Sequence, residues 1–187
     1  QAMQAAQAAA RNAAQAAGTS RTLPQLAVPD GLAPGGLQVA PGSGLWSGAN
    51  LPTQANVNGR TSVGITQTAP QAILNWNSFN VGARTTLTFD QQGNANWVAL
   101  NRVVGSTAPS QILGNIKADG AVYVINQNGI IFGGTSQINV HTLIASTLDL
   151  PSQLSGSNYK GFLQSGLFSQ LGNVPVSVVP PNTASGA

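Results

Sequence analysis

Between residues 45 and 150, short runs of β-branched and aromatic residues alternate with turn residues. Apolar and polar side chains alternate within Ser62–Thr66, Thr86–Phe89 and Asn96–Leu100, which is the pattern of half-buried β-strands. Gly and Asn stand between the runs, and no part of this region combines helical periodicity with capping residues. Short strands spaced at roughly 8–12 residues are typical of a sandwich, a barrel or a solenoid. The pattern therefore predicts an all-β fold.

The clearest turn lies at residues 126–130, where Asn-Gln-Asn-Gly-Ile interrupts the β-prone stretch Val122–Gly134. Asn and Gly tolerate positive φ, so the chain can turn tightly here between two strands. More β-prone segments follow at Gln137–Val140 and Leu143–Thr147, and none of them contains an acid or a thiol. Repeated strands and turns of this kind indicate a winding β architecture and not an active site.

A solenoid is favoured by the region from residue 112 to residue 147. Its aliphatic and aromatic residues recur in short groups that polar turns separate: Ile116, Val122, Val124, Ile130, Phe132, Ile138, Val140 and Ile144. The stacked coils of a parallel β-helix need brief strands with aliphatic side chains inside and small polar residues at the corners. The pattern alone leaves an antiparallel sandwich open.

The two ends differ from this region in composition. Residues 1–17 form an Ala/Gln tract that ends at Gly18, which predicts a short helical leader that frays at its ends. Residues 18–44 are rich in Pro and Gly and are interpreted as a linker, either draped over the domain or loose. We expect the main domain to cover residues 45–150.

After Pro151 the β-pattern stops, and residues 151–187 are interpreted as an insertion followed by the start of further coils. The insertion is expected to be irregular or partly helical, and β-structure is expected to resume at Val174–Val179. Its apolar residues are spaced unevenly: Phe162, Leu163, Leu167, Phe168 and Leu171. A solenoid whose last hydrophobic layer is uncovered is usually part of a longer one.

Composition excludes several classes of function. Only 6% of the residues are charged, against about 25% in ordinary soluble domains. The formal net charge of +3 comes from bases that are scattered along the chain, whereas nucleic-acid binding requires a basic patch. There is no cysteine, so disulfides, thiolate metal sites and thiol nucleophiles are excluded together. We therefore predict no nucleic-acid partner and no metal or other cofactor.

Catalytic side chains are also scarce. His141 is the only histidine and has no neighbouring acid, so it cannot form a triad or a zinc site. Asp90, Asp119 and Asp149 could supply the paired carboxylates of a β-helical lyase or hydrolase, but Asp90 and Asp119 stand in turn-like contexts where Asp is ordinarily a turn former. The sequence therefore predicts a protein that is not an enzyme.

Several phrases, in this order, carry a resemblance to a known family. They are Leu45-Trp46, Gly48-Ala-Asn-Leu-Pro-Thr53, Gln71-Ala-Ile-Leu-Asn-Trp-Asn-Ser-Phe-Asn-Val-Gly82, Trp97-Val-Ala-Leu-Asn-Arg-Val-Val104, Ser110-Gln-Ile-Leu-Gly-Asn-Ile-Lys-Ala-Asp-Gly120 and the turn at 126–130. Together they resemble the N-terminal secretion domain of filamentous-haemagglutinin-like exoproteins, also called the haemagglutination activity domain. These exoproteins are exported by two-partner (type Vb) secretion. The match covers roughly residues 45–150.

The resemblance implies a right-handed parallel β-helix with an N-terminal cap and extra-helical strands. It implies a secreted or surface-exposed bacterial exoprotein that passes through the periplasm to an outer-membrane transporter with periplasmic POTRA-type domains. The rest of such an exoprotein would meet host or bacterial surface receptors. The family's Asn-Pro-Asn-Gly-Ile motif maps onto Asn126, Gln127, Asn128, Gly129 and Ile130, with Gln127 in place of Pro. The family's second motif, Asn-Pro-Asn-Leu, has no match here.

We expect this chain to be the secretion-directing, fold-nucleating domain of a large adhesin-like exoprotein. A structural or adhesive surface module that self-assembles into filaments is the second interpretation. A β-helical polysaccharide lyase or hydrolase is the third.

Overall fold

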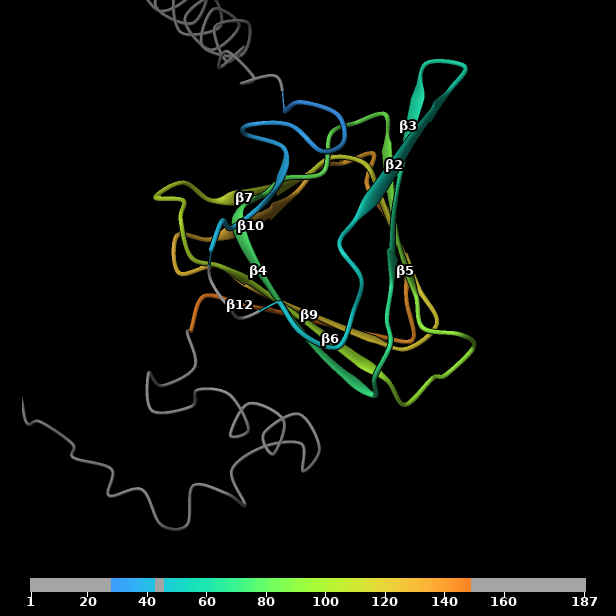
Figure 1. The fold of residues 1–187 in the computed structure, drawn as a ribbon. Helices are drawn as coiled ribbons and strands as arrows, with labels where there is room; N and C mark the ends of the chain where they lie inside the picture. The colour runs from blue at the N-terminus through green and yellow to red at the C-terminus, as the bar shows by residue number, and fades with distance from the viewer. Residues whose placement is uncertain (1–27, 43–45, 149–187) are drawn as a thin grey trace, which may run out of the picture.

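The computed structural model describes residues 28–42 and 46–148, which form β-strands and no α-helix (Figure 1). The all-β prediction is thus confirmed for the described part of the chain. The expected helical leader at 1–17 and the expected insertion at 151–187 lie outside it. The strands are Leu37–Val39 (β1), Thr53–Val57 (β2), Arg60–Thr66 (β3), Gln71–Phe79 (β4), Thr85–Asp90 (β5), Val98–Val103 (β6), Ser110–Ile112 (β7), Asn115–Ala118 (β8), Ala121–Ile125 (β9), Ile130–Phe132 (β10), Gln137–Asn139 (β11) and Thr142–Ser146 (β12).

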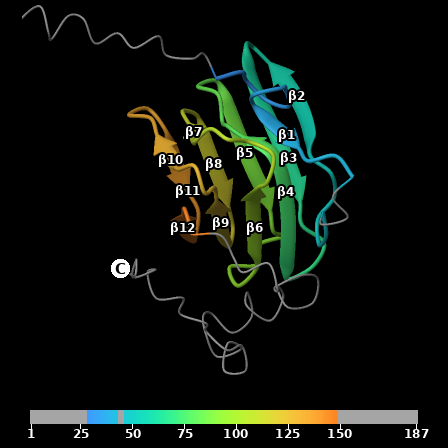
Figure 2. The ribbon, with the colours of Figure 1, turned by 90° about the vertical axis from the view of Figure 1, so that its left-hand side faces the viewer.

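The strands wind into coils whose three sides are three sheets (Figure 1). The first sheet, called the β4 sheet below, has the order β1-β4-β6-β9-β12, and the second, the β3 sheet, has the order β11-β8-β5-β3-β2. A short third side is formed by β7 and β10. Figure 2 shows successive coils lying side by side, from β3 and β4 at one end to β11 and β12 at the other.

Successive coils are joined by parallel pairing in register. In the β3 sheet the direct neighbours in successive coils are Val63, Leu87, Ile116 and Ile138. In the β4 sheet they are Leu74, Asn101, Val124 and Ala145. From β3 onward, strands that follow each other along the chain belong to different sheets. Each coil therefore pairs with the coil before it through all of its strands. The expected parallel β-helix is confirmed, and the antiparallel sandwich that the pattern left open is excluded.

The core lies inside the coils and is formed by the apolar side chains of the alternating strands, which point inward. Val63 and Leu87 from the β3 sheet and Leu74 from the β4 sheet are fully buried and belong to one cluster. Trp76 lies in the same cluster, with ring centroids 5.2 Å from Trp46 and 5.3 Å from Phe79 in edge-on geometry. Burying side chains of this size contributes roughly 1.5–3 kcal/mol each.

A cap closes the N-terminal end of the helix. The expected Pro/Gly-rich linker begins to be described at residue 28, and residues 28–42 lie on the β-helix. Within them, β1 pairs antiparallel with β4, and Leu37 beside Phe79 is buried. Further along, Ser47 forms an antiparallel bridge with Ile73 on the same edge. The N-terminal cap that the resemblance implies is therefore present.

Asp30 connects the cap to the chain at the start of β5 through hydrogen bonds. Its Oδ1 accepts hydrogen bonds from the backbone N–H of Arg84 at 2.9 Å and from Thr85 Oγ1 at 3.0 Å. Thr85 Oγ1 in turn accepts a hydrogen bond from the backbone N–H of Gly31 at 2.9 Å. This polar clasp satisfies backbone donors at the point where the chain enters the fold.

The extra-helical strand is β2, which pairs antiparallel with β3. The two strands are joined by Asn58 and Gly59, both at positive φ (50° and 71°), the combination that a tight type I′ hairpin turn requires. Every residue of β2 is exposed. The hairpin projects from the β3 sheet beside the cap (Figure 1).

Candidate functional site

The predicted turn at 126–130 lies between β9 and β10, where the chain passes from the β4 sheet to the side formed by β7 and β10. Asn126 is buried, whereas Gln127 and Asn128 are exposed at the tip. Gly129 has a φ of +113°, a conformation that side chains with a Cβ rarely adopt. Its backbone N–H donates to the Asn126 carbonyl at 3.0 Å and closes the turn. Residues 126–130 therefore form a turn, and their role as a secretion motif stays a prediction.

Asn126 joins this corner to the preceding coil. Its Nδ2 donates to the carbonyl of Ala108 at 3.1 Å and to Ser110 Oγ at 3.0 Å. Its Oδ1 accepts the backbone N–H of Asn128 at 3.0 Å and Asn128 Nδ2 at 3.2 Å. Both ends of one buried amide are thus satisfied, as a buried polar side chain requires.

Two more hydrogen bonds connect the same pair of coils. Asn128 Nδ2 donates to the Ser106 carbonyl at 2.9 Å, and the Ser110 backbone N–H donates to the Gly129 carbonyl at 3.0 Å. We call residues 126–130, together with residues 106–110 on which they rest, the asparagine corner. It pairs polar groups that are 16–22 residues apart in the chain, so it can form only after both coils are present.

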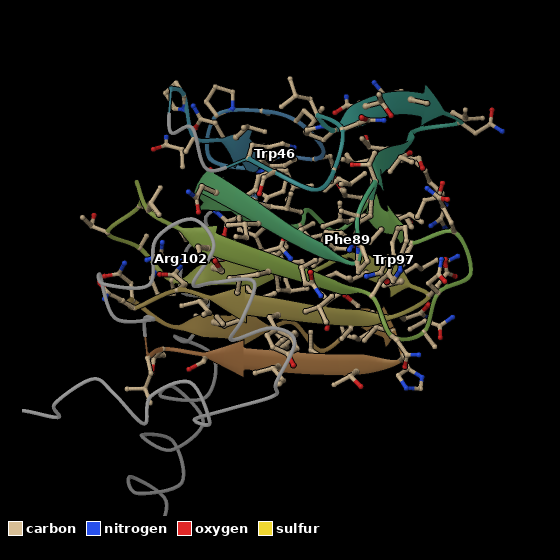
Figure 3. All side chains as sticks on the ribbon, turned by 60° about the horizontal axis from the view of Figure 1, so that its bottom comes forward. Trp46, Phe89, Trp97 and Arg102 are labelled. Carbon is tan, nitrogen blue, oxygen red and sulfur yellow. The ribbon has the colours of Figure 1, made fainter. Side chains whose placement is uncertain are left out.

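A second polar corner was missed from the sequence. Gln67 and Gln91 are fully buried, and Gln91 Nε2 donates to Gln67 Oε1 at 3.0 Å and to the Trp97 carbonyl at 3.2 Å. Gln91 Oε1 accepts the backbone N–H of Gly120 from the next coil. We call Gln67, Gln91 and Gly120 the glutamine corner. It lies beside Trp97, whose carbonyl Gln91 contacts; Figure 3 shows Trp97 and Arg102 at opposite sides of the coils.

One signal could have revealed the glutamine corner. Gln67 and Gln91 are 24 residues apart, about one coil, and each directly follows the last residue of a strand in the β3 sheet. A polar residue that recurs at the coil period predicts a ladder along the solenoid.

Asp90 and Asp119, the described acids that the sequence offered for catalysis, both bond to backbone N–H groups. Asp90 Oδ1 accepts the backbone N–H of Gln92 at 3.1 Å within its own turn. Asp119 Oδ2 accepts those of Gln91 at 3.3 Å and Gly93 at 3.1 Å, and so joins two coils. His141 is exposed. Residues 28–42 and 46–148 hold no group of three His, Cys, Asp or Glu side chains that could bind a metal ion. Asp149 lies outside the described residues.

The sequence matches the family model of the TPS (two-partner secretion) secretion domain over residues 37–183. The chain therefore belongs to the TPS secretion domain family, a family of secretion domains and not of enzymes. The class implies a secretion-directing domain of a secreted exoprotein, with an outer-membrane transporter as its partner. The match is wider at both ends than the predicted 45–150. Within the described ranges, no helix is long and apolar enough to cross a membrane.

Individual relatives come from Haemophilus influenzae. The chain is 42% identical over 94 residues to a heme/hemopexin-binding protein, and 41% identical over 97 residues to the protein of the same name from strain ATCC 51907 / DSM 11121 / KW20 / Rd. These matches cover 50% and 52% of this chain but 10% of each relative. The crystal structure of the HMW1 secretion domain from the same species is similar at 31% identity, with a TM-score of 0.46, over 56% of this chain and 27% of that one.

The chain thus spans about a tenth of the curated relatives that it matches. The name heme/hemopexin-binding protein refers to those whole proteins, and the matched segment is only a small part of them.

Proposed function

We propose that this domain carries a large adhesin-like exoprotein through the periplasm to its transporter, and that residues 126–130 are the segment that the transporter reads. POTRA-type periplasmic domains bind the passenger as an extended chain, by adding its strands to their own sheets through main-chain hydrogen bonds. The exoprotein then reaches the cell surface or the medium, where its remaining length contacts host or bacterial receptors.

The observation that carries this proposal is how the asparagine corner uses its polar groups. In the folded coil, Asn126 makes hydrogen bonds through both atoms of its amide, and Asn128 donates to Ser106. In the extended chain the same amides and main-chain groups are free to bond to a receptor. Recognition and folding therefore compete for one set of donors and acceptors, so folding of the coil releases the receptor.

The chemistry of the described residues supports the same role. Asp90 and Asp119 bond to backbone N–H groups, and the low charge of 6% eases passage of an extended chain through a narrow pore. Each new coil needs only the preceding coil as a template, so the β-helix can grow as the chain emerges. The proposed unit includes the cap, the predicted core at 45–150 and the following segment, since the family match extends to residue 183.

The test is export of a double variant, Asn126→Ala with Asn128→Ala, co-produced with the cognate transporter. We expect the secreted fraction to fall at least tenfold at an unchanged transporter level, as measured by immunoblot of medium and cells. The matched control is Gln91→Ala, which weakens the folded glutamine corner but leaves residues 126–130 intact. Normal export of the double variant, or an equal loss in the control, would contradict recognition at this segment.

A further inference from the structure

The outer face of the β4 sheet carries a group of apolar side chains, bordered by polar residues such as Gln71, Asn75 and Arg102. Along β4, Ala72 and Leu74 belong to the interior core, so the residue between them, Ile73, points outward. Ile73 lies beside Leu100, then Tyr123, then Ile144 in successive coils. Ile144 is exposed, but the first three of these residues and their outward neighbours form a second cluster. It is here called the outer cluster: Ile73, Val98, Leu100, Ala121, Tyr123 and Ile125.

The outer face of the β3 sheet shows what an uncovered side looks like. Its outward residues are Ser62, Thr86 and Asn115 in one row, with Thr88 and Lys117 in the next. Ser62 and Lys117 are exposed. A solenoid strand that faces water needs apolar side chains only on its inner face, whereas a sheet that is apolar on both faces is normally covered on both.

The outer cluster is in fact buried, although it lies outside the coils. Leu100 is 0% exposed and Ile73 is 3% exposed. Among residues 28–42 and 46–148, the cluster contains only side chains of its own sheet. Both side-chain polar atoms of Asn75, which is on this face, are also buried and have no hydrogen-bond partner. No apolar side chain from another described element therefore packs on this cluster, although Leu100 and Ile73 are buried.

We propose that the outer cluster is the docking site of residues 154–171 of this same chain. The last strand of the β4 sheet, β12, ends at Ser146, so the chain leaves the fold beside this face. The family match continues to residue 183, so the domain includes the segment that follows. That segment supplies large apolar side chains with a single charge, at Lys160: Leu154, Phe162, Leu163, Leu167, Phe168 and Leu171.

The other ends of the chain fit this site less well. The Ala/Gln tract at 1–17 precedes the family match and has few large side chains. Residues 174–179 alternate Val with Pro and Ser, which suits a further coil strand better than a cover. The docking of 154–171 has a consequence for assembly: the β4 sheet keeps one face open until the chain has emerged beyond residue 171.

The test uses single cysteines, because the chain contains none. In the full chain, Leu100→Cys reports the outer cluster, Ser62→Cys reports an exposed outward position, and Val122→Cys reports the inner core. Each is combined with a cover variant, in which Phe162, Leu163, Leu167, Phe168 and Leu171 are all changed to Ser. A matched control changes Val174, Val176, Val178 and Val179 to Ser. Reaction with a thiol reagent is followed by absorbance.

We expect Leu100→Cys to react at least about tenfold more slowly than Ser62→Cys in the parent, and to approach its rate in the cover variant only. Val122→Cys should remain protected throughout. The proposal is overturned if Leu100→Cys is reactive in the parent, if it stays protected in the cover variant, or if its protection is lost on dilution, which would indicate a second copy. If the cover variant unfolds, Val122→Cys will also become reactive. The single variants Phe162→Ala and Phe168→Ala then test the proposal. In each of them Leu100→Cys must become more reactive while Val122→Cys stays protected.

Discussion

The asparagine corner and the glutamine corner solve the same problem in different ways. Each joins consecutive coils through side-chain amides, so each replaces main-chain pairing where the strands are interrupted. In the glutamine corner both amides are buried, and Gln91 bonds to groups of its own coil and both adjacent coils. In the asparagine corner only Asn126 is buried, while Gln127 and Asn128 stay exposed at the tip.

The difference separates a structural role from one that can also serve recognition. A buried corner such as the glutamine corner presents no free polar group to a partner once it has formed. Breaking its hydrogen bonds leaves buried donors and acceptors unpaired, which costs free energy. A corner with an exposed tip holds fewer polar groups in buried bonds, so it opens at a lower cost in free energy and frees those groups for a receptor that binds the extended chain. The contrast predicts that stability depends more on the glutamine corner and export more on the asparagine corner.

The largest loss of stability is expected at Gln91. Gln91→Met keeps the volume but removes the bonds to Gln67, Trp97 and Gly120, which leaves buried donors and acceptors unpaired. The free energy of unfolding should fall by about 3 kcal/mol, as measured by urea denaturation. As a control, Gln127→Met at the exposed tip should change it by less than about 0.5 kcal/mol. Equal effects at the two positions would remove the distinction between the corners.

A smaller loss is expected from Asn126→Ala. The substitution removes two donated and two accepted hydrogen bonds, but water can reach the tip and bond to the freed Asn128 groups. We expect a loss of about 2 kcal/mol in the same urea experiment. Asn128→Ala should cost under about 1 kcal/mol, because its side chain is exposed. A loss at Asn126 greater than that at Gln91 would reverse the proposed order.

The smallest effect is expected from Gln127→Pro, which restores the residue that the family motif carries. Proline narrows the conformations of the unfolded chain and thereby stabilises a turn whose backbone it can adopt, by about 0.4–1 kcal/mol. Export should be unchanged, because the Asn and Gly that form the turn remain. A destabilised variant in thermal denaturation would show that this corner has departed from the family's backbone as well as from its sequence.

The sequence was sufficient to predict elements whose cause is local. Alternation within Thr86–Phe89 identified a strand, because the inward side chains Leu87 and Phe89 are the apolar ones. The turn at 126–130 was evident for the same reason, because it depends on the backbone freedom of Gly129, which has positive φ. The parallel β-helix itself was favoured by recurrence of short apolar groups and specified by family resemblance.

What could not be predicted depends on partners one coil away. Nothing near Gln91 in the sequence shows that its amide meets Gln67 and Gly120. The Pro/Gly composition of residues 28–42 indicated a linker, yet the contacts of Asp30 and Leu37 place that segment on the fold as a cap. Likewise, a run such as Ala99–Leu100 gives no indication that both faces of its sheet are buried.

The cap has a further consequence for how copies of the domain meet one another. A β-helix has unpaired strand edges at each end, and such edges invite stacking of one molecule on the next. At the N-terminal end, antiparallel β1 and the bridge at Ser47 occupy the edge of β4, while the neighbouring sheet ends in the polar hairpin strand β2. End-to-end stacking of copies through the N-terminal end is therefore disfavoured. Many copies can then lie close together, and each β-helix adds new coils only at its C-terminal end.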